Sequence, residues 1–161
     1  MQSANKTESN PEKVTSSDFD DLMGFCIEDL SVGQTAVFAK TVSEADIVLF
    51  AGISGDINPV HLNHEFATET MFEGRIAHGL LTASFVSTVI GTKLPGPGAI
   101  YLKQSLNFKA PVRAGDTVRA RATIMEINMD KRRVVIETVA TVGDKVVLDG
   151  EALILVPTRE A

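Results

Sequence analysis

The stretch SGDINPVHLN places a carboxylate, Asp56, five residues before an imidazole, His61. Gly55 lets the backbone turn sharply, and the pair Asn58-Pro59 stiffens the loop and keeps Asn58 out of helical geometry. Such a rigid loop can present Asp56 and His61 toward one point. A carboxylate and an imidazole that share a water can divide proton transfer between them. The alternative interpretation is that Asp56 caps the following turn and His61 is an ordinary surface imidazole.

Gly79 stands near the start of the run HGLLTASFVSTVIGTKL, which predicts a long helix over 78–94. Free N–H groups at a helix start, helped by the helix dipole, can hold an oxygen that gains negative charge. The alternative is a plain helix start with Gly for close packing. Ser87 follows after about two turns and shares a face with Gly79. Its hydroxyl could orient a neighbouring side chain or bond back to its own helix.

Other reactive patterns are weak in this sequence. His61 and His64 with Asp56 have a loose spacing for a metal site, and neither a cysteine nor a fourth ligand accompanies them, so we expect no metal. The chain carries neither a Gly-rich phosphate loop that opens a helix nor a G-x-S-x-G hydrolase motif. We therefore expect no cofactor.

Composition narrows the class of protein. The 161 residues fit one domain, with 44% apolar and 22% charged residues. The net charge of −6 disfavours a nucleic-acid partner, and the longest apolar-rich run is interrupted by Ser and Thr, so no membrane helix is predicted. The single cysteine, Cys26, excludes an intrachain disulfide and favours the cytoplasm.

Two regions are expected along the chain. Residues 1–25 lack the apolar segment of a secretory signal and are rich in polar residues, which indicates a flexible N-terminal tail. Residues 26–161 are expected to form the folded domain.

The folded domain is predicted to be α+β. A strand over 35–42 precedes a helix that begins after Ser43 and stops near Gly52 and Gly55, and the loop 55–63 follows. A short helical piece and the long helix come next, and the long helix is apolar on nearly all sides, as in a helix wrapped by a curved sheet. Alternating patterns then predict four antiparallel strands, over 99–112, 116–127, 132–142 and 145–156.

Three segments closely resemble the MaoC-like, or hydratase 2, family, with the (R)-specific enoyl-CoA hydratases as the nearest match. They are FAGISGDINPVHLNHEFA, GRIAHGLLTAS and GPGAIYLKQSLNFKAPVRAGDTV, and the likeness covers about residues 30 to 156. The resemblance implies a hot-dog fold, in which an antiparallel β-sheet wraps around a long central α-helix, and a homodimer. It also implies a hydro-lyase that reversibly adds water to a trans-2-enoyl-CoA and gives the (R)-3-hydroxyacyl-CoA.

The resemblance also implies residue roles, with no departure at the motif positions. Asp56 and His61 would be the catalytic pair, and Gly79 N–H would form the oxyanion hole for the thioester carbonyl. Asn58 would shape the loop, and Ser87 would support the site. Ile90 lies three residues past Ser87 and so close to the same face. If the acyl tunnel runs along the long helix beyond Ser87, Ile90 would contact substrate and set the acyl chain length.

Other functions on the same fold stay open at this point. The chain could be a (R)-3-hydroxyacyl-ACP dehydratase of fatty-acid synthesis, a hot-dog thioesterase, or a non-catalytic acyl-CoA-binding hot-dog protein, although a mere binder needs no water-activating pair. The anionic end of CoA needs basic partners. The candidates, none of which the sequence singles out, are Lys103, Lys109, Arg113, Arg119, Arg121 and residues 131–133.

Overall fold

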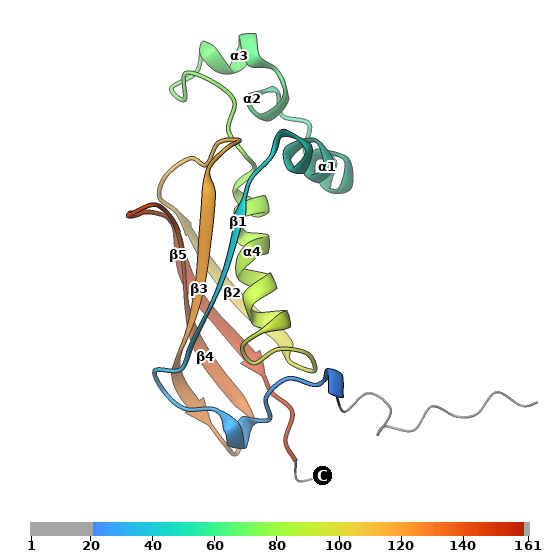
Figure 1. The fold of residues 1–161 in the computed structure, drawn as a ribbon, viewed down its shortest axis with the longest axis vertical. Coiled ribbons are helices and arrows are strands. Elements are labelled where there is room, and N and C mark those ends of the chain that lie inside the picture. The colour runs from blue at the N-terminus through green and yellow to red at the C-terminus, as the bar shows by residue number, and fades with distance from the viewer. Residues whose placement is uncertain (1–20, 160–161) are drawn as a thin grey trace, which may run out of the picture.

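The computed structural model describes residues 21–159 (Figure 1). A 3₁₀ helix, η2, comes first, and the predicted α+β order follows it. The elements are η2 (Ile27–Asp29), β1 (Thr35–Thr41), α1 (Glu44–Ser54), α2 (Pro59–Leu62), α3 (His64–Thr68), α4 (Gly79–Thr92), β2 (Ile100–Phe108), β3 (Thr117–Asn128), β4 (Arg133–Val142) and β5 (Lys145–Leu155). No helix within the described residues is long and apolar enough to cross a membrane.

Most of the predicted N-terminal tail lies outside the described residues. The described chain contacts the domain earlier than the predicted boundary at Cys26. The N–H groups of Gly24 and Phe25 donate to the carbonyls of Pro97 and Pro95, at distances of 2.9 and 2.8 Å. The segment just before Cys26 is therefore held against the turn that follows α4.

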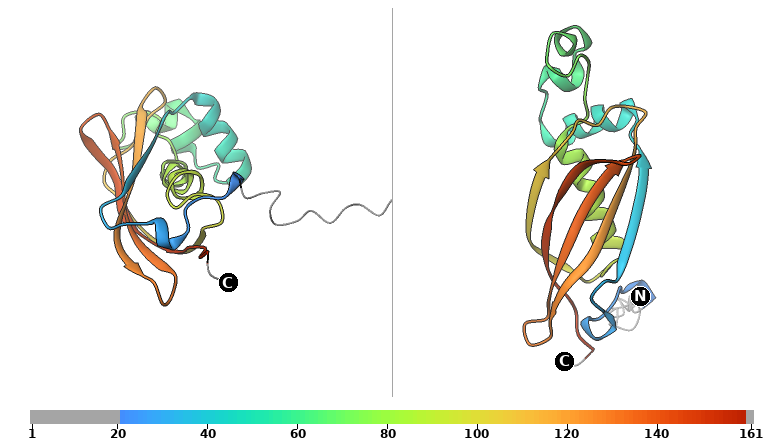
Figure 2. Two further views of the ribbon diagram at one scale, coloured as in Figure 1. Left: turned by 60° about the horizontal axis from the view of Figure 1, so that its bottom comes forward. Right: turned by 90° about the vertical axis from the view of Figure 1, so that its left-hand side faces the viewer.

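The sheet has five antiparallel strands in the order β1-β3-β4-β5-β2. Figure 2 shows it curving around α4, which lies on its concave side. Strand β3 explains the arrangement, because Val118, Ala120 and Ile124 are fully buried while the intervening Arg119 and Arg121 are exposed. This alternation matches the sequence prediction, and the hot-dog architecture is confirmed.

Helix α4 is buried on one side only, which differs from the prediction of a helix enclosed on nearly all sides. Phe85 and Val89 face the sheet and are buried, whereas Leu80, Ser87 and Gly91 are exposed. The difference arises because one five-stranded sheet covers only half of the helix surface. The uncovered half lies open in a single chain.

Helix α1 begins as the sequence predicts. The Ser43 hydroxyl accepts the Asp46 N–H at 3.2 Å, and the Asp46 carboxylate accepts the Ser43 N–H at 2.8 Å, which forms a capping box. Gly52 lies inside the helix, and Gly55, with φ of 75°, ends it. Hydrogen bonds from Lys40 and from Ser43 lower the pKa of Asp46 to about 2.

Replacing Asp46 by Asn should therefore destabilise the fold by about 1 kcal/mol at neutral pH, as loss of a helix cap does. Because the folded pKa is depressed from about 4, the carboxylate contributes stability above pH ~4 and loses it as the pH falls through about 2. Thermal unfolding of both proteins between pH 7 and pH 2 should show the gap in Tm closing in acid. Asp144→Asn, in the exposed β4–β5 turn, is the control and should show no gap at any pH.

Candidate active site

The segment between α1 and α2 presents Asp56. The Asn58 N–H donates to Asp56 Oδ1 at 3.2 Å, and the Asn58 side chain accepts the Val60 N–H at 3.2 Å. Asn58, with φ of −51° and ψ of 127°, lies outside the helical region as expected before a proline, and Pro59 opens α2. The prediction of an irregular loop over 55–63 is therefore wrong in its second half, because the Asn58 cap and Pro59 together start a helical turn.

His61 lies on that turn and is 8% exposed. Its Nδ1 is 2.9 Å from the Ile76 carbonyl oxygen, which only accepts hydrogen bonds. The proton of the neutral ring is therefore on Nδ1, and Nε2 carries the free lone pair. Nε2 lies 4.0 Å from Asp56 Oδ2. A lone pair and a carboxylate oxygen thus face each other across a gap that one water can bridge.

His78 is the neighbour that sequence reasoning missed. It precedes α4, is 2% exposed, and has Nε2 2.9 Å from the Asp56 carbonyl oxygen. Its ring stacks on that of His61, with centroids 3.8 Å apart and planes tilted by 32°. Within residues 21–159 its buried Nδ1 has no hydrogen-bond partner. His78 therefore joins the Asp56 backbone to the His61 ring. The sequence did offer a signal for His78, because it stands directly before Gly79 in the segment GRIAHGLLTAS, but a role was predicted for Gly79 alone.

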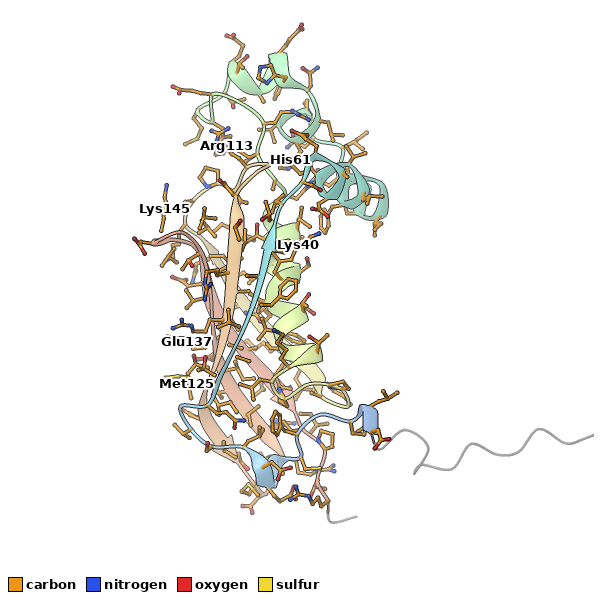
Figure 3. All side chains as sticks on the ribbon, in the orientation of Figure 1. Lys40, His61, Arg113, Met125, Glu137 and Lys145 are labelled. Atoms are coloured by element: carbon orange, nitrogen blue, oxygen red, sulfur yellow. The ribbon has the colours of Figure 1, made fainter. Side chains whose placement is uncertain are left out.

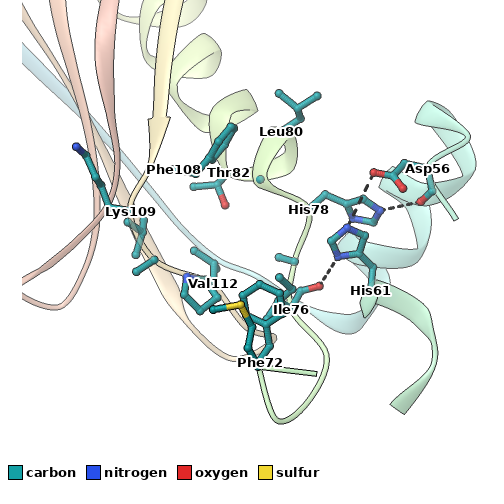
Figure 4. Close-up of a pocket in the computed structure, with 16 residues that line it drawn as sticks. Asp56, His61, Phe72, Ile76, His78, Leu80, Thr82, Phe108, Lys109 and Val112 are labelled. Atoms are coloured by element: carbon teal, nitrogen blue, oxygen red, sulfur yellow. Dashed lines mark hydrogen bonds and ion pairs between the residues drawn. The ribbon is translucent and has the colours of Figure 1, made fainter. Parts of the chain in front are cut away.

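A cavity of about 510 Å³ opens beside these residues (Figure 4). Its walls are largely apolar, formed by the segment before α4, the start of α4 and the end of β2 with the residues after it. The lining residues are Asp56, His61, Met71, Phe72, Ile76, Ala77, His78, Gly79, Leu80, Thr82, Phe108, Lys109, Ala110, Pro111, Val112 and Val147. Such a space suits an apolar group that ends near a few polar atoms.

Gly79 begins α4 at the wall of this cavity. The N–H groups of Gly79 and Leu80 find no acceptor among the described residues. A Cβ at position 79 would lie 2.7 Å from Cε1 of Phe108, so the absence of a side chain keeps this wall open. The helix start is thus free to donate to an oxygen in the cavity.

The structure brings together some of the predicted site residues and separates others. Asp56, His61 and Gly79 line the same cavity, and the Asn58 N–H donates a hydrogen bond to the Asp56 carboxylate. Ser87 is exposed on the open side of α4 and lies outside the cavity lining. Ile90 is 1% exposed, packs in the core, and does not line the cavity either, so it does not share the open face with Ser87.

Of the basic residues considered for the anionic end of CoA, only Lys109 lines the cavity. Its Nζ lies 3.3 Å from Asp149 Oδ2, and hydrogen bonds from Asn107 and Lys109 lower the pKa of Asp149. Arg113, labelled in Figure 3, donates instead to the carbonyls of Phe72 and Arg75 and ties two segments together.

A metal ion is a further chemical possibility for this geometry. Asp56, His61 and His78 each offer a ligand atom, and these atoms lie within 4.8 Å of one another. Of the two histidines considered from the sequence, His64 is exposed at the start of α3 and lies outside this group.

Comparison with known proteins identifies the family. The model of the MaoC like domain matches residues 30–147. The chain belongs to the MaoC-like family. The match covers β1 to β4, the Asp56–His61 segment, α4 and the start of β5, so all the residues that line the cavity lie within it.

Several MaoC-like relatives are similar over most of their length. An (R)-specific enoyl-CoA hydratase of Rhodospirillum rubrum is 55% identical over 140 residues, covering 87% of this chain and 97% of the relative. A 3-hydroxybutyryl-CoA dehydratase of Methylorubrum extorquens is 53% identical, covering 83% of this chain and 85% of the relative. The solved structure of R-hydratase PhaJ1 from Pseudomonas aeruginosa superposes with a TM-score of 0.80 at 42% identity, covering 84% of this chain and 88% of that one.

Proposed function

We propose that this chain is an (R)-specific enoyl-CoA hydratase that reversibly adds water to a trans-2-enoyl-CoA. The observation that carries the proposal is the pair of Asp56 Oδ2 and His61 Nε2, 4.0 Å apart, in the same cavity as the free Gly79 N–H. The names of the relatives in Rhodospirillum rubrum and Methylorubrum extorquens support the same reaction in its two directions.

The thioester carbonyl is the group that must be polarised. An enoyl thioester is attacked at C3 only when electron density can move from the C2–C3 double bond onto the carbonyl oxygen. The Gly79 N–H and the positive end of the α4 dipole would stabilise that oxygen as its charge grows. The apolar walls of the cavity would strengthen the effect by excluding bulk water.

The attacking water would sit between Asp56 and His61, donating one hydrogen to each. As its oxygen bonds to C3, one O–H bond breaks and His61 Nε2 takes the proton, since the Ile76 carbonyl keeps the ring proton on Nδ1. As the enolate collapses, the His61 imidazolium returns a proton to C2 and becomes neutral again. Asp56 would orient the water and balance the imidazolium charge. Because both groups stand on one side of the cavity, water adds to one face of the double bond.

The direct test follows the loss of the enoyl absorbance of crotonyl-CoA, with chiral analysis of the product. The proposal requires turnover and formation of (R)-3-hydroxybutyryl-CoA. Release of free CoA thiol would indicate a thioesterase instead. Faster turnover of the matching acyl-carrier-protein thioester than of the CoA thioester would indicate the dehydratase of fatty-acid synthesis.

We further propose a homodimer. Strand β2 is an edge of the sheet, and its apolar side chains Ile100 and Leu102 are exposed. A long apolar edge of this kind is normally covered. A second copy that pairs along β2 would extend the sheet and cover Leu80 and Ser87 as well. A supporting role for Ser87 would then act at the interface.

Light scattering at micromolar concentration should give about twice the chain mass of 17.3 kDa. Leu102→Asp should shift the protein toward the monomer, because a carboxylate would be buried unpaired at the interface. Val32→Asp, at a more exposed apolar residue before β1, is the control and should stay dimeric. A monomer with full activity would contradict the proposal.

The cytoplasm is the proposed location. Its basis is the single cysteine, Cys26, which is free in the structure and half-buried. Proteins that function in oxidising compartments more often use paired cysteines.

A further inference from the structure

Thr82 is a buried residue with a polar atom that the site described so far does not use. It lies on α4, is 3% exposed, and lines the cavity. Its hydroxyl makes no hydrogen bond within residues 21–159. Figure 4 shows the Thr82 oxygen on the side of the cavity, between Phe108 and His78.

Three other hydroxyls of the same helix bond back to its backbone, and Ser87, which makes no hydrogen bond within residues 21–159 either, is exposed to solvent. Ser84 donates to the Leu81 carbonyl at 2.6 Å, Thr88 to the Ser84 carbonyl at 3.1 Å, and Thr92 to the Thr88 carbonyl at 2.6 Å. Such back-bonding is the usual way in which a helix satisfies a hydroxyl. Thr82 is the hydroxyl residue nearest the cavity, and it leaves its donor unused.

The surroundings of Thr82 offer no replacement partner. Phe108, Val112 and Ala77 are apolar neighbours in the cavity wall. The Thr82 oxygen is not among the fully enclosed unpaired atoms of the described residues, so it reaches the cavity space and can take a partner there. The partner must therefore come from what occupies the cavity.

The position of Thr82 indicates which atom it can reach. It lies three residues after Gly79, so the two share one face of α4, and helical side chains lean toward the N-terminus. The hydroxyl is thus directed toward the helix end where the N–H groups of Gly79 and Leu80 are free. An acceptor held by Gly79 N–H lies in the region that the Thr82 hydroxyl faces.

We propose that Thr82 Oγ donates a second hydrogen bond to the thioester carbonyl oxygen, completing a two-donor oxyanion hole with Gly79 N–H. The inference rests on the proposed function for the identity of the ligand, an acyl thioester. Two donors would hold the carbonyl in one direction as well as stabilise its developing charge. Thr82 would then act on the reacting group itself and not through another residue.

Kinetics of three variants test this role. Thr82→Val keeps the shape and removes the donor, and kcat/KM on crotonyl-CoA should fall by about 10² with most of the loss in kcat, as for other oxyanion donors. Thr82→Ser restores a hydroxyl and should recover most of the loss. Thr88→Val, which removes a back-bonded hydroxyl from the same helix, should change kcat/KM by less than about twofold.

A second readout separates this inference from the proposed reaction. Butyryl-CoA lacks the double bond and cannot be hydrated. Its carbonyl stretch, followed by ¹³C-difference infrared spectroscopy, should move to lower frequency on binding to the wild type and move less with Thr82→Val. If the frequency shift is smaller with Thr82→Val but the wild type does not hydrate crotonyl-CoA, the two-donor oxyanion hole is supported and the proposed reaction is wrong. If the wild type hydrates crotonyl-CoA while Thr82→Val leaves both rate and frequency unchanged, the inference is overturned.

Discussion

Asp56→Asn and His61→Gln should each lower kcat by about 10² to 10⁴, the usual span for general acid–base catalysis. Asp56→Asn keeps the shape of the side chain, including an oxygen for the Asn58 N–H, but removes the charge that orients the water and balances the imidazolium. His61→Gln keeps a polar group but removes the lone pair that takes the proton. Steady-state kinetics on crotonyl-CoA measure both losses.

The double variant tests whether the two residues share one water. Its kcat should be little lower than that of the poorer single variant, because residues that act as a unit are strongly non-additive. Circular dichroism and the dimer mass serve as controls for folding. Losses that simply add would show that Asp56 and His61 act independently. Near-full activity of a folded single variant would remove that residue from the catalytic pair.

Gly79→Pro should lower kcat by about 10² to 10³ relative to Gly79→Ala, the effect of losing one oxyanion donor. Proline is accepted at the first position of a helix, and His78 already has the extended geometry, with ψ of 136°, that a following proline requires. The substitution therefore removes the N–H with little cost to α4. Stopped-flow single-turnover hydration of crotonyl-CoA gives the chemical step directly.

Gly79→Ala is the matched control because it also introduces a Cβ but keeps the donor. That Cβ would displace the Phe108 ring, which ends a flexible and largely exposed side chain and is free to move. We expect a smaller loss for this variant, on the order of tenfold, from misplacement of the substrate. Equal rates for the Ala and Pro variants would show that the N–H does not stabilise the oxyanion.

Local signals in the sequence predicted the parts of the fold that depend on neighbours along the chain. Ser43 and Asp46 marked the start of α1, and the alternation through β3 gave the buried face of the sheet. The Asp56–His61 spacing predicted two groups that the structure does place face to face. These features depend on capping, strand periodicity and short loops, which a single sequence encodes directly.

Features that depend on contacts distant in sequence escaped prediction. Periodicity alone could not show which half of α4 the sheet covers, so Ser87 and Ile90 were assigned to one face although one is exposed and the other buried. The pairing of His61 Nδ1 with the Ile76 carbonyl needs a contact between residues 15 apart, and the stacking of His78 on His61 needs the fold. In the sequence Thr82 does not differ from the other hydroxyl residues of α4, and only the structure shows that its hydroxyl makes no hydrogen bond to the helix backbone.

Ile76, whose carbonyl orients His61, also ends a segment of the chain that projects beside the cavity. The Ile76 carbonyl accepts a hydrogen bond from the His61 ring, and the Ile76 N–H donates to the Val60 carbonyl at 3.3 Å. The Arg113 side chain donates to the carbonyls of Phe72 and Arg75. The segment from Leu62 to Arg75, which contains α3, is thus held at its C-terminal end by hydrogen bonds to Arg113 and, through Ile76, to Val60. We therefore expect changes in the length and sequence of this segment to leave the orientation of the imidazole unchanged. Because Met71 and Phe72 in this segment line the cavity, we expect substitutions there to change which acyl groups fit while leaving the proton-transfer pair in place.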